Sequence, residues 1–529
     1  MPNYYRPNQG ILAENLEALT GINEVLITNI NACKDLKNLV SSSYGPYGER
    51  KLIIQKNQKI LITSDSSVIL NNLDFTHPAS KLILTSVFFQ EQELGDSSGF
   101  VIIFTAELLD QALKLLNMGF HSIEIIKTFQ KAENVCLNLL YMFSNHKLKN
   151  LEVLKSIVSI LQSLVGFKCE NLTKNLIPQI SYACVKISSN KNQKFTPENI
   201  RVVKILGGGV CNTRTIPGTL VLRDSEGTVK IKKNARIAIY SCFFDFLSPE
   251  TKNKVQFSSP GEILSYESKE YNLMEKRIQN FLSKEINVII ASGFNEDMLK
   301  ILDDNNIMAI KIQSKFEIQR IALVTNSTVM PKLGIPELSA IGYADKVSTR
   351  SFGFQKVTIF YQQSIQNNIF TIVARANCNS ILDLIERFVC KTSSIFKTIV
   401  RDNRFIPGAG ACEIEISRRL KSFSQNLTSS SEKFIFKKFA ESFEIFPEIL
   451  IQNSKLKGSK LLSHLYNQHE KGIETAGLDL ENFKVICSKK FGVWDLFSSK
   501  FWAIKNSIDS ALTILSIDQI IISKDAHQN

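Results

Sequence analysis

Residues 95–99, Gly-Asp-Ser-Ser-Gly, could bind a phosphate because they separate a charged segment from an apolar run that predicts a helix. Free backbone N–H groups and the positive end of the helix dipole make a helix N-terminus an anion site. A carboxylate beside a phosphate would repel it, so Asp96 indicates a bridging Mg²⁺. The same residues are also typical of an ordinary helix cap, in which a short oxygen side chain accepts a backbone hydrogen bond.

Other common chemistries find little support in the residues. The chain contains no Gly-x4-Gly-Lys-Ser/Thr phosphate loop. Its 10 Cys include no CxxC pair and it has only 6 His, which argues against a zinc site and for buried thiols. The net charge of +13 is spread along the chain rather than gathered into a basic arm, so we attribute it to a drift toward lysine and not to nucleic-acid binding.

The length of 529 residues predicts about three domains. A chain with 44% hydrophobic and 21% charged residues has the composition of a soluble globular protein. No apolar run approaches the roughly 18 residues that a membrane span needs. The first residues, MPNYYRPNQG, lack the apolar segment of a signal peptide.

The elements that would position residues 95–99 are predicted from periodicity. Residues 11–40 predict one long helix that ends at SYGPYG, and 51–54 with 59–63 predict a hairpin. The hairpin leads into SDSS at 64–67, where Asp65 precedes a short helix. Three turns rich in Gly, Asp or Ser therefore occur in the first 100 residues and could converge on one phosphate pocket.

The middle of the chain has a different texture. A strand at 200–206 ends in three glycines that read as a hinge or an irregular loop. Strands and helices then alternate, which predicts an inserted α/β domain of about 150 residues, with a helix at 315–325. Within it, 243–272 has no clear period and reads as a binding surface or an ordinary long loop.

The last third of the chain is predicted to be helical again. A long helix is expected at 379–401, and a glycine-rich turn at 404–411 leads into the next helix. Turns are expected at 477–479 and 492–495, before a helix at 501–516. The two ends of the chain would then form one domain, which brings the turns at 44–48, 64–67, 95–99, 408–411 and 492–495 together.

Several segments in this order resemble the group II chaperonins. They are SSYGPYGERK at 42–51, HPASKLIL at 77–84, EQELGDSSGFVIIF at 91–104, NIRVVKILGGGV at 199–210, RDNRFIPGAGACEIEI at 401–416 and GLDLE at 477–481. The resemblance implies a multidomain α and α/β fold. It would comprise a mainly helical equatorial ATP-binding domain (1–145 and 402–529), a small intermediate hinge domain (146–214 and 368–401) and an inserted α/β apical domain (215–367). The apical domain would bind substrate and carry a helical lid protrusion at about 243–272.

The same resemblance implies a function. The chain would be a subunit of a cytoplasmic chaperonin built as a double eight-membered hetero-oligomeric ring with the other chaperonin subunits. It would bind ATP with Mg²⁺, and K⁺ as a further cation, and would assist the folding of proteins such as actin and tubulin by closing its lid. Neither a membrane nor nucleic acid is an expected partner.

The resemblance also implies roles for single residues. Asp96 would bind Mg²⁺, and Asp65 would position the attacking water. The expected nucleotide-binding residues are Tyr44, Gly45, Pro46, Asp96, Ser97, Ser98, Gly99, Phe100, Gly408, Gly410, Asp495 and Lys500.

The chain departs from the family pattern at four positions. Ser97 and Ala409 stand where the family has glycine, and Val68 where it has threonine. Lys391 stands where the family has its catalytic aspartate, and a lysine has no acceptor with which to activate water. We therefore expect a subunit that binds Mg·ATP and hydrolyses it poorly. The alternative is a non-cycling ring subunit that contributes client contacts only.

Overall fold

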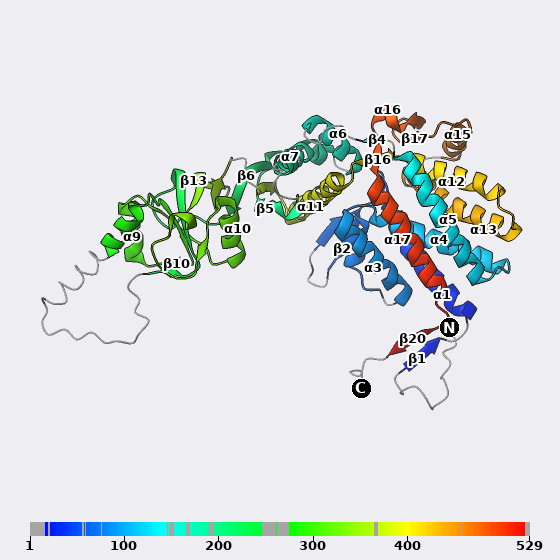
Figure 1. The fold of residues 1–529 in the computed structure, drawn as a ribbon, viewed down its shortest axis with the longest axis horizontal. Helices are drawn as coiled ribbons and strands as arrows, with labels where there is room; N and C mark the ends of the chain where they lie inside the picture. The colour runs from blue at the N-terminus through cyan, green and yellow to red at the C-terminus, as the bar shows by residue number, and fades with distance from the viewer. Residues whose placement is uncertain are drawn as a thin grey trace. The chain divides into compact units, whose positions relative to one another are not determined.

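The computed structural model separates the chain into two compact units. One, here called the terminal unit, comprises Met1–Ile177 and Cys390–Asn529, and the other, the inserted unit, comprises Pro178–Val389 (Figure 1). The structure describes residues 16–19, 22–55, 58, 60–75, 77–144, 146–147, 153–165, 170–189, 195–245, 261, 274–363, 369–455 and 458–523. The inserted middle of the chain was predicted. The finer division into equatorial, intermediate and apical domains stays a prediction.

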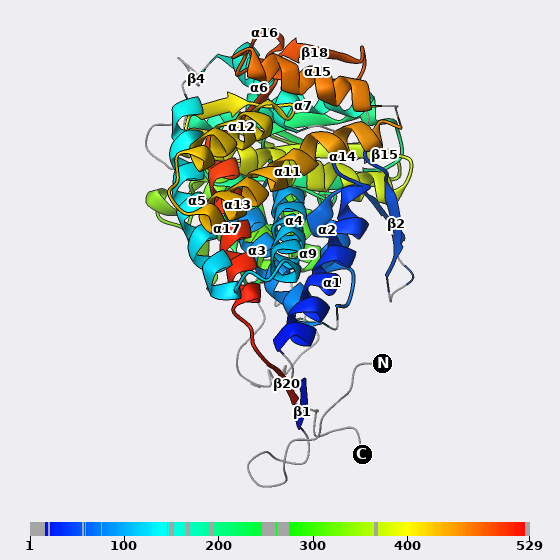
Figure 2. The ribbon, with the colours of Figure 1, turned by 90° about the vertical axis from the view of Figure 1, so that its right-hand side faces the viewer.

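The terminal unit is built around one helix, α4 (Ser98–Asn117), whose residues are buried along most of its length. Figure 2 shows α4 with other helices on several sides of it. The helices that pack on α4 include α1 (Ile22–Ser41), α3 (Pro78–Leu94), α5 (Ser122–Phe143), α13 (Ser430–Glu441) and α17 (Phe497–Leu515). A helix that is apolar all round needs such a surround, because each of its faces must be kept from water.

Shorter elements complete the terminal unit. The helices are α2 (Ser66–Asn71), α6 (Leu154–Leu164), α12 (Ala411–Gln425), α14 (Ile445–Asn453), α15 (Ser459–Glu470) and α16 (Ser488–Phe491). The strand pairs are β1 (Leu16–Leu19) with β20 (Ile520–Ser523), β2 (Lys51–Ile54) with β3 (Ile60–Thr63), and β17 (Ala476–Asp479) with β18 (Lys484–Cys487). In a three-stranded sheet, β16 (Arg404–Pro407) lies between β19 (Trp494–Leu496) and β4 (His146–Lys147).

The inserted unit contains a sheet in the order β11-β9-β7-β13-β14-β6-β15-β5, with β12 beside β7. Its strands are β5 (Ile200–Leu206), β6 (Arg214–Val221), β7 (Ile231–Tyr240), β9 (Val288–Ala291), β11 (Met308–Lys311), β12 (Val329–Met330), β13 (Gly342–Phe352), β14 (Gln355–Tyr361) and β15 (Phe370–Ala376). Helices α9 (Glu296–Asp304) and α10 (Lys315–Thr325) follow β9 and β11. The chain passes between the two units within α7 (Glu170–Ser188) and α11 (Asn379–Arg401).

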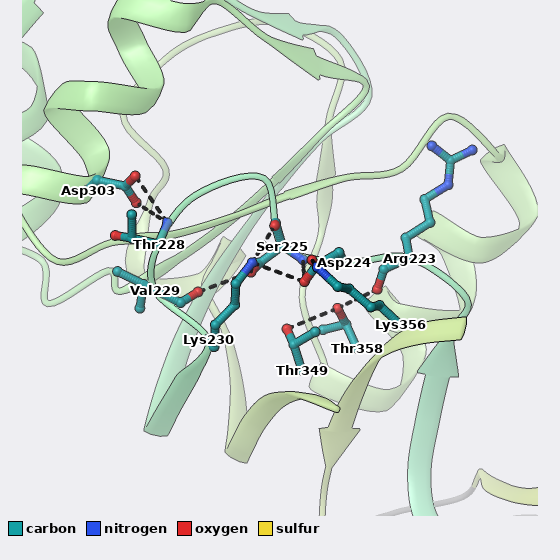
Figure 3. A network of polar contacts seen from close by, with 10 residues as sticks. All are labelled: Arg223, Asp224, Ser225, Thr228, Val229, Lys230, Asp303, Thr349, Lys356 and Thr358. Atoms are coloured by element: carbon teal, nitrogen blue, oxygen red, sulfur yellow. Dashed lines mark hydrogen bonds and ion pairs between the residues drawn. The ribbon is translucent and has the colours of Figure 1, made fainter. Parts of the chain in front are cut away.

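A polar network holds the loop between β6 and β7 in the inserted unit (Figure 3). The carboxylate of Asp224 lies 3.0 Å from the Lys230 ammonium and 2.8 Å from that of Lys356 on β14. The backbone N–H of Thr228 donates to the Asp303 carboxylate on α9, at 3.0 and 3.1 Å from its two oxygens. We call Asp224, Lys230 and Lys356 the Asp224 cluster. It fixes the loop to β14, and the Thr228–Asp303 hydrogen bonds fix the same loop to α9.

Most of the predicted elements are confirmed. The hairpin at 51–54 and 60–63, the helix at 315–325 and the long helix at 379–401 lie where periodicity places them. The prediction for 243–272 falls largely outside the described residues, apart from a short strand at Phe243–Phe244. Among the described residues, no helix combines the length and apolarity needed to cross a membrane.

Four predictions are wrong, and three of the errors have the same cause. The helix expected over 11–40 begins at Ile22, and Leu16–Leu19 instead form a strand that pairs with β20. The turn expected at 477–479 is strand β17. The turn expected at 492–495 contains the start of strand β19, and the helix expected at 501 begins at Phe497. For each of the three strands, a strand partner elsewhere in the chain decides the local conformation, which short apolar runs leave open.

Candidate functional site

The turn between α3 and α4 carries Asp96 and is shaped by left-handed backbone. Gly95 ends α3 with φ 73°, and Ser97 precedes α4 with φ 66° and makes no capping hydrogen bond with its side chain. The Nε2 amide of Gln90, which is buried, donates to the carbonyl oxygens of Asp96 (3.3 Å) and Ser499 (3.0 Å). The turn is therefore stabilised by the Gln90 amide rather than by a capping hydrogen bond from Ser97.

A lysine lies between two carboxylates beside this turn. The Lys391 Nζ atom on α11 is 3.6 Å from Asp65 Oδ2 and 3.9 Å from Asp96 Oδ1. The Lys391 side chain is 31% exposed, and each of the two aspartates is 25% exposed, so a ligand could reach all three. We call Lys391, Asp65, Asp96 and the nearby Glu91 the Lys391 cluster.

Burial and the neighbouring charges shift the pKa values of Lys391 and Glu91 in the Lys391 cluster. Burial of the Lys391 ammonium lowers its pKa, but the carboxylates of Asp65, Asp96 and Glu91 outweigh burial, so that the pKa is raised above its usual range. Burial and the neighbouring Asp65 raise the pKa of Glu91. Lys391 is consequently a permanent cation at neutral pH, and it cannot serve as a base.

Asp65 stands at the N-cap position of α2 but makes no capping hydrogen bond. Its backbone N–H donates to Thr63 Oγ1 at 3.0 Å, and its Oδ1 accepts a hydrogen bond from Ser67 Oγ at 3.2 Å. The other carboxylate oxygen of Asp65 is the one near Lys391. An aspartate whose side chain does not cap its helix is available for another role.

The glycine-rich turn after β16 lies against Asp495. A Cβ on Gly408 would come within 3.0 Å of Asp495 Oδ1. Gly410, with φ 79°, immediately precedes α12, and Ala409 before it also adopts a left-handed φ of 59°. Ser97 and Ala409, the two residues that replace family glycines, thus both sit where an L side chain is strained, typically by about 1–2 kcal/mol.

A buried ion pair underlies the turn that carries Asp495. The ammonium of Lys500 pairs with Glu413 on α12 and lies 3.5 Å from Asp495 Oδ2. Burial lowers the pKa of Lys500, but Glu413 and Asp495 raise it well above its usual range. Burial raises the pKa of Asp495, and Lys500 partly opposes this. Lys500 is only 7% exposed, so it would support Asp495 rather than touch a ligand.

The predicted residues of the first loop and of α4 meet at an aromatic contact. The Tyr44 ring packs on Phe446 with centroids 5.8 Å apart, and a Cβ on Gly99 would lie 3.4 Å from the Tyr44 ring. The Asn453 side-chain amide donates to the Tyr44 carbonyl at 2.7 Å, which ties the loop of Tyr44, Gly45 and Pro46 to α14. The φ of 82° at Gly45 suits only a glycine well.

The five predicted turns thus lie in one unit, with contacts that link them. Phe100 is 1% exposed and its ring stacks on Phe446 at 4.1 Å, so its side chain belongs to the core. Ser98 is also buried. Sequence reasoning missed Gln90, Glu91 and Glu413, which hold or charge the turns. Glu91 and Glu413 fall within segments that carry the family resemblance, whereas Gln90 has no such local signal.

The donor set at Asp96 is a poor fit for Mg²⁺. Magnesium prefers oxygen ligands at about 2.0–2.1 Å in octahedral geometry. Here an ammonium already lies beside the Asp96 and Asp65 carboxylates. Among the described residues, no group of three or more His, Cys, Asp or Glu is arranged to hold a metal ion.

A helical unit made from both ends of a chain, with an α/β unit inserted and glycine- and aspartate-bearing turns gathered in one place, is the architecture expected of a chaperonin. Comparison with known families agrees with this. The model of the TCP-1/cpn60 chaperonin family matches residues 36–525, and the chain belongs to that family.

Curated relatives cover nearly the whole chain. T-complex protein 1 subunit theta of Dictyostelium discoideum is 35% identical over 517 residues, which are 98% of this chain and 96% of the relative. The human subunit theta is 34% identical over 524 residues (98% and 94%), and the Arabidopsis thaliana one is 33% identical over 521 residues (98% and 95%). The EQELGD segment at 91–96 and the tail with WAIK at 502–505 and DQII at 518–521 resemble the same subunit type. The relatives confirm this resemblance.

Proposed function

We propose that this chain is an ATP-binding subunit of a cytoplasmic ring chaperonin and that it hydrolyses ATP slowly. It would assemble with the other subunits into a double eight-membered hetero-oligomeric ring and assist the folding of client proteins, with actin and tubulin as the clients that the family suggests. The family membership and the subunit named by the relatives support assembly and chaperone activity.

ATP binding is supported by the gathering of the predicted turns in the terminal unit. Gly408 lies against Asp495, Gly99 against Tyr44, and Asp96 stands at the N-terminus of a 20-residue helix. A helix N-terminus with free N–H groups suits a phosphate. Asp96 is the residue expected to bind Mg²⁺, and the Lys391 ammonium competes with the metal for the Asp96 carboxylate.

Slow hydrolysis rests on one observation, the placement of Lys391 between Asp65 and Asp96. Hydrolysis needs an acceptor that orients or deprotonates the attacking water. An ammonium donates hydrogen bonds and accepts none. It also engages Asp65, the residue expected to position that water.

The domains that would move in such a subunit are those implied by the family resemblance. Residues 1–145 and 402–529 would form the equatorial domain, 146–214 and 368–401 the hinge, and 215–367 the apical domain with its lid at about 243–272. Binding of ATP would shift the population of hinge positions and close the lid. The three glycines at 207–209, two of them with φ near 90°, suit a hinge.

The nucleotide found at this one site tests the proposal. The assembled particle would be exposed briefly to Mg·ATP and imaged by cryo-electron microscopy. We expect intact ATP here while neighbouring subunits hold ADP, and ADP here in a K391D particle. K397D, which changes a lysine on the same helix, is the matched control. ADP at this site as often as in its neighbours, or fast turnover that survives K391A, would contradict slow hydrolysis.

A non-cycling structural subunit is the second candidate. The left-handed φ values of Ser97 and Ala409 favour it. The family has glycine at both positions, where the backbone can approach a phosphate closely, and a Cβ there obstructs that approach. An empty site in the imaged particle, in both the unaltered chain and the K391D variant, would establish this alternative and overturn ATP binding.

A further inference from the structure

The Lys391 ammonium is a cation that the protein itself supplies to the neighbouring carboxylates. It lies 3.6 Å from Asp65 Oδ2 and 3.9 Å from Asp96 Oδ1, and Glu91 adds a third negative charge nearby. Without Lys391, the Asp65 and Asp96 carboxylates would lack this counter-ion, and the negative charge of Glu91 would add to theirs. That arrangement attracts a divalent cation, because like charges at close range repel strongly unless a positive charge lies between them.

Helix packing holds the backbone of Lys391 beside the two aspartates. One turn along α11, the Ser394 side chain lies so close to Gly95 that a Cβ on that glycine would come within 2.4 Å of it. A further turn along, Thr398 Oγ1 donates to the Leu94 carbonyl at 3.1 Å. Both contacts join α11 to the turn that carries Asp96. The ammonium therefore starts close to the carboxylates instead of reaching them from a distant surface.

The two cations cannot use the same oxygens at once. Mg²⁺ bound by Asp96 would bring a charge of +2 against the Lys391 ammonium, in a site only about a quarter exposed. The ion would have to displace the ammonium from both aspartates, and water would have to resolvate it. An ammonium with three N–H donors can neutralise carboxylates and phosphate oxygens together, although it supplies half the charge of a magnesium ion.

We propose that the Lys391 ammonium takes the place of Mg²⁺ in this site, so that the chain binds ATP without needing a divalent cation. This inference rests on the proposed binding of ATP. Mg²⁺, when it is bound at such a site, bridges phosphate oxygens and neutralises the charge that develops during transfer. A lysine can retain the nucleotide by charge but does not replace that function.

Metal binding by the full chain is the first test, and it needs no nucleotide. Mn²⁺ serves as the probe, and its free concentration is read by electron paramagnetic resonance. We expect K391M, which keeps an unbranched side chain only one atom shorter but removes its charge, to bind Mn²⁺ at least tenfold more tightly than the unaltered chain. K391R, which keeps the charge, and K397M, on the same helix, should both bind as weakly as the unaltered chain.

ATP binding with and without metal is the second test. Calorimetric titration with ATP would be run in Mg²⁺ and in EDTA. The unaltered chain should change its affinity by less than about threefold between the two conditions, and K391M should lose at least tenfold in EDTA. The measurement on the unaltered chain is informative even if K391M does not fold.

Three outcomes separate the two ideas. ATP binding by the unaltered chain that collapses in EDTA overturns the replacement of Mg²⁺ and leaves ATP binding intact. Equal Mn²⁺ affinity in the unaltered chain and K391M also overturns it. If no version binds ATP in either condition, the proposed function fails, while the Mn²⁺ measurement still reports on Lys391.

Discussion

The Asp224 cluster and the Lys391 cluster use the same charges in opposite proportions. At Asp224 one carboxylate lies between two ammonium groups, at 3.0 and 2.8 Å. At Lys391 one ammonium lies between two carboxylates, at 3.6 and 3.9 Å, with a third acid nearby. The first has the short distances of ordinary ion pairs, and its pairs hold a loop. The second has longer distances and leaves acid in excess.

The difference shows that a charge cluster must be judged by what remains unneutralised. Excess lysine on an open surface is solvated by water, so the Asp224 cluster needs no further partner. The excess carboxylate charge beside the N-terminus of α4 is only partly neutralised, because Lys391 supplies a single positive charge. Two further groups are buried, the Lys500–Glu413 pair and Glu415. They allow the effect of burial on stability to be distinguished from the effect of how many charges of each sign a cluster holds.

Removing the Lys500 charge should have the largest effect. K500M leaves Glu413, which is 3% exposed and has one carboxylate oxygen without a hydrogen-bond partner, as an uncompensated buried charge. Loss of one member of a buried pair typically costs about 3–5 kcal/mol. Urea unfolding of the full chain measures this. K505M, on the same helix α17, is the control and should change the free energy of unfolding by well under 1 kcal/mol. Equal losses in the two variants would show that Lys500 is not a buried charge.

Glu415 repeats the Asp224 arrangement in a buried setting. Burial raises its pKa, but hydrogen bonds from His469, Arg418 and Arg419 outweigh burial and lower the pKa to about 2 from 4.5. The side chain is 1% exposed, and a shift of this size corresponds to about 3 kcal/mol of stability. E415Q should lose about that much at pH 7.

The effect of E415Q should depend on pH in a definite direction. Because the folded pKa is lower than the unfolded one, the stabilisation by Glu415 is complete above about pH 5 and disappears as the pH falls through about 2. Urea unfolding at pH 7 and pH 3 should show the gap between E415Q and the unaltered chain shrinking by more than half. A gap that is constant with pH would mean that hydrogen bonding, and not charge, is lost.

The Asp224 cluster should give the smallest effect. Asp224 is 28% exposed, and partly exposed ion pairs contribute about 1 kcal/mol or less. D224N should therefore lower the free energy of unfolding of the full chain by about 1 kcal/mol, and K356M by less, since Lys230 remains. Hydrogen exchange should show the loss confined to residues 222–230. A loss as large as that of E415Q would show that burial is not what separates the two sites.

Much of the fold could be predicted because the signals are local. The helix at 315–325 and the hairpin at 51–63 follow from apolar spacing alone. The elements that were missed, β1, β17 and β19, are strands of three or four residues whose partners fix them. The candidate site shows the same division. Its glycine and aspartate turns were predicted from residue types, whereas Gln90, inside helix α3, carries no local mark of its role.

The sequence by itself determined which residues are available to the site and that a lysine stands where the family has an aspartate. It also determined the helical–α/β–helical order, because periodicity and glycine placement are properties of neighbouring residues. Only the tertiary structure decided that Lys391 lies between Asp65 and Asp96 together, and that Ser97 and Ala409 fall on left-handed backbone. Such facts depend on contacts between residues some 300 positions apart and on the conformation that packing imposes on a turn, which no local pattern of residue types specifies.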